Sequence, residues 1–194
     1  MSAETGDVEL VGDATASNLA RAALFAALIG AFAYVSFPNP VSPAPVTLQV
    51  LGVFLAGILL GPVWGGAACG LYLLAGALGA PVFAGGSAGL GVLVGPTAGY
   101  LWSYPFAAAA IGGVVHGGAS LTDPKAAGLA RLVGAMVLGV VVIYTFGVTG
   151  LMVVQNLGPA EAFVGGAAAF IPAEALKIAA GVGIVRSDAI AATS

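Results

Sequence analysis

A long stretch without charged side chains constrains this sequence more than any other feature. Between Ala22 and Thr122 there is no Asp, Glu, Lys or Arg. One transmembrane helix takes about 20 apolar residues, so the stretch is long enough to cross a bilayer several times. Charged residues make up only 7% of the chain, compared with about 25% in soluble globular domains. The sequence therefore predicts an all-α, polytopic membrane protein.

Hydropathy divides the chain into six expected transmembrane helices within one substrate-binding domain, residues 19–186. Segments rich in Gly and Pro separate them, such as PNPVSPAP, GP at 61–62 and PVFAGGSAGLG. The expected spans are 19–37, 46–60, 63–80, 93–116, 129–154 and 162–185.

The basic residues predict the orientation of this bundle, because cytoplasmic loops collect Lys and Arg. With six crossings and an internal N-terminus, the outer loops near 38–45, 81–92 and 155–161 contain no basic residue. The basic residues on the cytoplasmic side are then Arg21, Lys125, Arg131 and Arg186. We therefore expect a plasma-membrane protein with both termini in the cytoplasm.

The two ends of the chain are expected to lie outside the bundle. Residues 1–18 are polar and rich in acids, which predicts a disordered cytoplasmic tail. This segment lacks the basic start and the apolar core of a signal peptide. Residues 187–194 are expected to form a short cytoplasmic tail.

Glu174 and Lys177, in FIPAEALKIAAG, are the most informative residues because they lie near the middle of the last expected span. An ionisable group at that depth is costly and usually serves a function. Their spacing places both side chains on one helical face, where they can neutralise each other or bind a polar ligand. Lys177 would face a ligand carboxylate, and Glu174 would accept ligand N–H groups. Pro172, just upstream, is expected to kink this helix towards the cavity.

Uncharged polar residues elsewhere are candidates to complete such a site. The glycine-rich segment GGSAGLGVLVG, residues 85–95, is expected to cover or line the pocket. Structural alternatives are that Gln49 bonds to loop backbone, that Thr97 caps a helix and that Tyr100 anchors at the interface. Nearby aromatic residues either line the pocket or form an interface belt: Phe83, Tyr100, Trp102, Tyr104 and Phe106. The candidate binding residues are Gln49, Gly86, Ser87, Thr97, Tyr100, Glu174 and Lys177.

Small residues repeat at four-residue spacing along the first expected span. This spacing produces a smooth stripe on one helical face. The stripe serves either internal packing or the docking of another membrane protein. It consists of Ala22, Ala23, Ala26, Ala27 and Ala31.

Several classes of function lack the residues they need. Cys69 and His116 are the only cysteine and histidine, so no disulfide framework, metal site or catalytic constellation is expected. The glycine-rich segment has no Gly-Lys-Ser/Thr, so the chain is not expected to hydrolyse ATP. We expect no catalytic residues, no cofactor and no nucleic-acid partner.

Three segments resemble the BioY family in their order and spacing: PVTLQVLGVFLAGILLGPVWG, GLYLLAGALGAPVFAGGSAGLGVLVGPTAGYL and FIPAEALK. The resemblance covers most of residues 20–185. It implies the biotin-binding S component of an energy-coupling-factor (ECF) transporter, which captures biotin from outside and works with a transmembrane coupling subunit and two ATPase subunits. It also implies that the alanine stripe contacts the coupling subunit, and that Glu174 and Lys177 touch biotin. The family more often has Gly-Asp where this chain has Ala173 and Glu174.

Biotin also fits the site expected from the residues. Its ureido N–H groups suit Glu174 or backbone acceptors, its carboxylate suits Lys177, and its bicyclic body suits aromatic and glycine-lined walls. An S component for another vitamin, such as thiamine or riboflavin, is the main alternative. A membrane scaffold would not need the charged pair, and an intramembrane enzyme would need a catalytic constellation.

Overall fold

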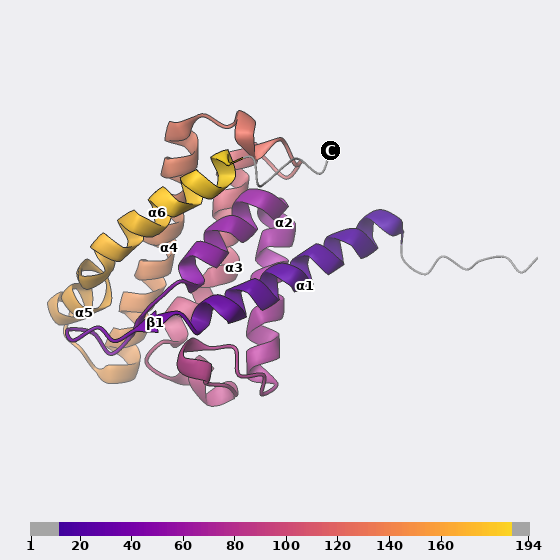
Figure 1. Cartoon of the computed structure of the whole chain (residues 1–194). Helices are drawn as coiled ribbons and strands as arrows, with labels where there is room; N and C mark the ends of the chain where they lie inside the picture. Colours follow the sequence, from indigo (N-terminus) through magenta and orange to yellow (C-terminus); the bar gives the residue numbers. More distant parts are fainter. Residues whose placement is uncertain (1–11, 188–194) are drawn as a thin grey trace, which may run out of the picture.

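The computed structural model describes residues 12–187, whose regular structure is almost entirely helical, in agreement with the predicted fold class (Figure 1). One short antiparallel ladder pairs β1 (Ser36–Phe37) with β2 (Val46–Thr47). The helices are α1 (Asp13–Ala33), α2 (Gln49–Ala77), α3 (Ala98–His116), α4 (Leu129–Gln155), α5 (Pro159–Gly166) and α6 (Ile171–Arg186). Short 3₁₀ turns are η1 (Ala84–Gly86), η2 (Leu90–Val94), η3 (Pro124–Ala126) and η4 (Ala168–Phe170).

The helix α2 is folded back on itself at Gly61. The backbone there has φ 75° and ψ −175°, and Pro62 follows. In a straight helix, Gln49 and Tyr72 would lie about 35 Å apart, yet the Gln49 amide donates a hydrogen bond to the Tyr72 hydroxyl. The two arms, 49–60 and 62–77, are therefore antiparallel neighbours (Figure 1). They correspond to the separate second and third spans predicted from the sequence.

The helix α3 lies at the centre of the bundle, where it packs against both α2 and α4. The outer helices complete the arrangement, with α1 against α2 and α6 against α2 and α4. Within residues 12–187, four helical stretches are individually long and apolar enough to cross a membrane: Asp13–Ala33, Gln49–Ala77, Leu129–Gln155 and Pro159–Arg186.

The first helix begins earlier than the sequence predicted. α1 starts at Asp13 rather than near residue 19, so part of the segment expected to be a tail is helical. A carboxylate in the first turn is favourable because it faces the unpaired N–H groups at the helix start. Residues 1–11 of the expected N-terminal tail, and 188–194 of the C-terminal one, lie outside the described residues.

The last expected span is two helices rather than one. After α5 ends, Ala167 (φ −135°, ψ −58°) interrupts the helical path before η4 and α6. Pro172 is the second residue of α6, where its missing N–H costs no hydrogen bond, so it begins the helix and does not kink it. Glu174 therefore lies in the first turn of α6 and not in mid-helix, close to N–H groups that favour a carboxylate.

Candidate ligand-binding site

A cavity of about 200 Å³ lies between the start of α2, the loop before α3, the first turns of α3, the middle of α4 and the start of α6. This volume is below the roughly 300–1,000 Å³ of typical ligand pockets, so the cavity suits a compact ligand. The lining residues are Ala44, Pro45, Thr47, Gln49, Val50, Phe83, Ala84, Ser87, Val92, Thr97, Tyr100, Leu101, Tyr104, Ile143, Tyr144, Phe170, Glu174 and Lys177.

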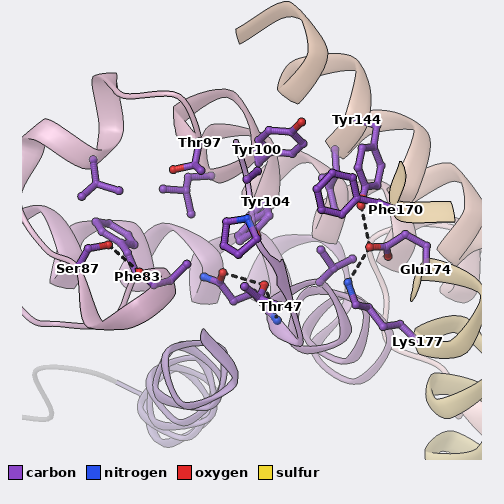
Figure 2. Close-up of a pocket in the computed structure, with 18 residues that line it drawn as sticks. Thr47, Phe83, Ser87, Thr97, Tyr100, Tyr104, Tyr144, Phe170, Glu174 and Lys177 are labelled. Carbon is purple, nitrogen blue, oxygen red and sulfur yellow. Dashed lines mark hydrogen bonds and ion pairs between the residues drawn. The ribbon is translucent and has the colours of Figure 1, made fainter. Parts of the chain in front are cut away.

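One end of the cavity is charged. Figure 2 shows Glu174 and Lys177 beside Tyr144 and Phe170. Glu174 and Lys177 are only 3% and 5% exposed, and the Lys177 Nζ lies 2.7 Å from Glu174 Oε1. The Tyr144 hydroxyl donates to the same oxygen over 2.8 Å. The other oxygen, Glu174 Oε2, is buried and has no hydrogen-bond partner.

An aromatic wall continues from this charged end. Tyr100 meets Tyr144 edge to face, with ring centroids 5.9 Å apart at 82°. Phe170 lies 5.7 Å from the Tyr144 ring and 6.5 Å from the Tyr100 ring. The Tyr100 hydroxyl donates to the Gly166 carbonyl oxygen at 2.7 Å. Tyr100 therefore offers a ligand its ring, while its polar atom is held by backbone.

The aromatic residues before and within α3 lie in two different environments. Phe83, Tyr100 and Tyr104 are buried and line the cavity. Trp102 and Phe106 are 49% and 59% exposed on the outside of the bundle. The pocket alternative therefore holds for Phe83, Tyr100 and Tyr104, while the interface belt stays a prediction for Trp102 and Phe106.

Gln49 is held in a buried network at the start of α2. Thr47 Oγ1 donates to Gln49 Oε1 at 3.0 Å, and the Gln49 amide nitrogen donates to Tyr72. Tyr72 in turn packs against Phe83, with ring centroids 5.5 Å apart, and against Tyr104, 6.3 Å away. Gln49 therefore lines the cavity with a side chain whose orientation is fixed.

The loop before α3 supplies the far end of the cavity (Figure 2). Ser87 is exposed and its hydroxyl donates to the Ala84 carbonyl at 2.9 Å. Thr97 precedes α3 and makes no capping hydrogen bond, so its side chain faces the cavity without the expected capping role. Gly86 does not line the cavity, although its positive φ of 74° helps to shape the turn.

Tyr144, Phe170 and Thr47 line the cavity but were not among the sequence candidates. Tyr144 interrupts the apolar run VLGVVVIYTFGV. A buried tyrosine in such a run needs a hydrogen-bond partner for its hydroxyl. This requirement is the one sequence signal that Tyr144 faces a polar group. No local pattern links it to Glu174, 30 residues away.

The alanine stripe of α1 divides between two faces. Ala22 is buried and Ala26 is half-buried against the bundle. Ala23, Ala27 and Ala31 are exposed and follow one another at four-residue spacing.

Cys69 and His116 are both buried inside the bundle. In the part of the chain that the structure describes, no group of three or more His, Cys, Asp and Glu side chains is arranged to hold a metal ion.

Comparison with known proteins identifies the family. The sequence model of the BioY family matches residues 4–192. The chain belongs to the BioY family. The biotin transporter BioY of Rhizobium etli is 40% identical over 169 residues, 82% of this chain and 86% of the relative. That of Thermotoga maritima is 42% identical over 131 residues, 68% of this chain and 72% of the relative.

A solved structure shares the BioY fold described above. It is the S-component for biotin from an ECF-type ABC transporter, with a TM-score of 0.81 and 26% sequence identity. The match covers 91% of this chain and 93% of that one. The family resemblance inferred from the three sequence segments is confirmed.

Proposed function

We propose that this BioY protein is the biotin-binding S component of an ECF-type uptake transporter. The observation that carries the proposal is the cavity with Glu174 and Lys177 at one end, where Glu174 Oε2 is buried without a partner. A buried carboxylate oxygen without a donor is costly, and a ligand N–H removes that cost. Biotin transporters and a biotin S-component are the proteins that this chain resembles.

The charged end of the cavity suits the ureido group of biotin. Because Glu174 and Lys177 are paired at 2.7 Å, they offer a ligand no net charge. A ureido edge carries a carbonyl acceptor beside N–H donors. Lys177, with donors left over from its bond to Glu174, meets the carbonyl, and Glu174 Oε2 accepts an N–H.

The valerate carboxylate lies at the opposite end of biotin from the ureido group, so one residue pair does not bind both. In this arrangement the carboxylate points towards Ser87 and Thr97 at the far end of the cavity (Figure 2). This assignment replaces the sequence expectation that Lys177 meets the carboxylate. The bicyclic body of biotin lies against the rings of Tyr100 and Phe170.

Equilibrium binding of biotin to the purified protein in detergent tests the proposal, with thiamine and riboflavin as competing vitamins. We expect selective biotin binding that Glu174→Ala and Lys177→Ala each weaken at least about tenfold, because hydrogen bonds to charged groups contribute roughly 1.5–3 kcal/mol. Glu161→Ala, which removes an exposed acid in α5, is the matched control. Absence of biotin binding by folded wild-type protein would overturn the proposal.

The double variant Glu174→Ala/Lys177→Ala separates ligand contacts from folding. A single substitution leaves the other charge buried without its partner, which is itself destabilising. The double variant removes both charges and should melt nearer to the wild type while still failing to bind biotin tightly.

The proposed topology has six spans in the plasma membrane and both termini in the cytoplasm. The folded-back α2 supports this count, because its antiparallel arms correspond to two of the six proposed spans. The turn at Gly61 lies beside the α3–α4 connection, since His116 contacts both Ile58 and Thr122. Lys125 lies in that connection and Arg131 in the first turn of α4, and basic residues favour the cytoplasmic side, which supports an inner location for this end. The ligand cavity, built from the opposite helix ends, then faces outward beneath the loop at 81–95.

The proposed partners are a transmembrane coupling subunit and two ATPase subunits, and neither an enzymatic activity nor a cofactor is assigned to this chain. The exposed alanines Ala23, Ala27 and Ala31 support a docking role for α1, because small side chains let two helix backbones approach closely. Transport would then follow from capture of biotin outside and reorientation of the bundle on its coupling subunit.

A further inference from the structure

Tyr144 connects two helices at the charged end of the cavity. It comes from α4, whereas Glu174 and Lys177 come from α6. Its hydroxyl donates to Glu174 Oε1 at 2.8 Å, and Lys177 Nζ donates to the same oxygen at 2.7 Å. Two donors therefore converge on one carboxylate oxygen and hold the carboxyl group in a single orientation.

This convergence leaves the second carboxylate oxygen for a ligand. Glu174 Oε2 is buried and has no hydrogen-bond partner within the protein. An ionised carboxylate only accepts hydrogen bonds, so the position facing Oε2 favours a ligand group that donates. The orientation of the carboxylate determines which ligand atom can occupy that position, and Tyr144 helps to fix this orientation.

Tyr144 and Glu174 also form the wall between two spaces. Both residues line the ligand cavity and a second, apolar groove between α4 and α6 on the outside of the bundle. That groove is walled mainly by aliphatic side chains, including the exposed Val141 and Ile171. A carboxylate turned towards such a surface would lose hydrogen-bond partners. The hydroxyl of Tyr144 opposes that rotation.

The Tyr144 side chain is itself held by neighbouring rings. Tyr100 packs against it edge to face and Phe170 packs beside both rings, each with its centroid within 6 Å of that of Tyr144. A tyrosine held in this way gives its hydroxyl one preferred direction, towards Glu174.

We propose that Tyr144 is a positioning residue that sets specificity for a ligand N–H donor, because it holds Glu174 Oε1 and so presents Oε2 alone to the ligand. This inference rests on the proposed function, in which the donor is a ureido N–H of biotin. Tyr144 contributes discrimination among ligands in addition to affinity.

The variant Tyr144→Phe, which keeps the ring and removes the donor, tests this role. The probes are biotin and its two isosteric cyclic carbamates, in each of which oxygen replaces one ureido N–H. We expect wild-type protein to prefer biotin over one carbamate by at least about tenfold, since a hydrogen bond to a charged group is lost. In Tyr144→Phe, biotin affinity should fall about tenfold and that preference should shrink to a few-fold.

A purely structural role predicts a different pattern. It would weaken biotin and both carbamates by the same factor, and that outcome, or unchanged affinities, would overturn the inference while leaving the proposed function intact. Failure of wild-type protein to bind biotin would instead remove the proposed function itself. Thr145→Val is the matched control, because that neighbouring hydroxyl on α4 donates only to the Val141 carbonyl and does not line the cavity.

Infrared spectroscopy of the wild-type protein provides a second test that does not depend on the folding of a Tyr144 variant. Biotin that bonds to Glu174 Oε2 should shift the infrared carboxylate stretch of one buried glutamate. Glu174→Gln, which lacks the carboxylate, identifies the band. An unchanged carboxylate band in biotin-saturated protein would also contradict the inference.

Discussion

His116 donates a hydrogen bond from Nε2 to the Ile58 carbonyl oxygen, 3.0 Å away. The Thr122 backbone N–H donates to the other ring nitrogen, Nδ1, so the proton of a neutral ring lies on Nε2. Ile58 would ordinarily bond to the N–H four residues later, but that residue is Pro62, which has none. His116 thus supplies the donor that Pro62 lacks at the turn of α2.

His116→Leu should lower stability because it leaves the buried Ile58 carbonyl without a donor. A cost of about 1–3 kcal/mol is expected, which corresponds to a fall of several degrees in melting temperature in detergent. His116→Gln, whose amide can still donate towards Ile58, should lose less. Because His116 does not line the ligand cavity, biotin affinity at low temperature should change little. Equal melting temperatures for the wild type and the leucine variant would contradict this role.

Gly147→Ala should weaken biotin binding through Tyr100. A Cβ at position 147 would lie 2.1 Å from Tyr100 Cε1, so the ring must leave the position in which it bonds to Gly166 and packs against Tyr144. Such overpacking typically costs 1–3 kcal/mol, and binding isotherms should show a loss of about tenfold or more. Gly134→Ala, on the same helix with no other atom within 4 Å of the added Cβ, should bind as the wild type does. Identical affinities for both variants would show that Tyr100 tolerates displacement.

The elements that local patterns determine were predictable from the sequence. The apolar stretches and the Gly-Pro break located the helices, and the Glu174–Lys177 spacing placed both charges on one face. What could not be predicted depends on contacts between distant segments. α4 is apolar on most of its surface, so no periodicity shows that Tyr144 faces Glu174.

Hydropathy also could not predict the break between α5 and α6. Residues 159–186 are predominantly apolar, and hydropathy does not distinguish one helix from two. Pro172 carried the relevant signal, because proline is favoured in the first turn of a helix. Interpreted as a helix start rather than a kink, it would have placed Glu174 near a helix N-terminus.

The proposed topology predicts which loops reagents reach from outside the cell. Single cysteines are introduced into a Cys69→Ala background at Val41 and Ser120, both exposed at opposite ends of the bundle. A membrane-impermeant maleimide should label the cysteine at position 41 in intact cells, and the one at position 120 only after permeabilisation. The background variant without added cysteines measures non-specific labelling. The reverse pattern would invert the topology.

Ala27→Leu should separate partner docking from ligand binding. Ala27 is exposed at the centre of the stripe formed with Ala23 and Ala31, and a larger side chain would hold a neighbouring helix backbone away. Co-purification with the coupling subunit and its ATPases should fall at least about tenfold, while biotin binding by the isolated chain stays at the wild-type level, because α1 does not line the cavity. Val153→Leu adds bulk to an exposed position on α4 and should leave both properties unchanged. Full complex formation by Ala27→Leu would assign the docking surface to another face of the bundle.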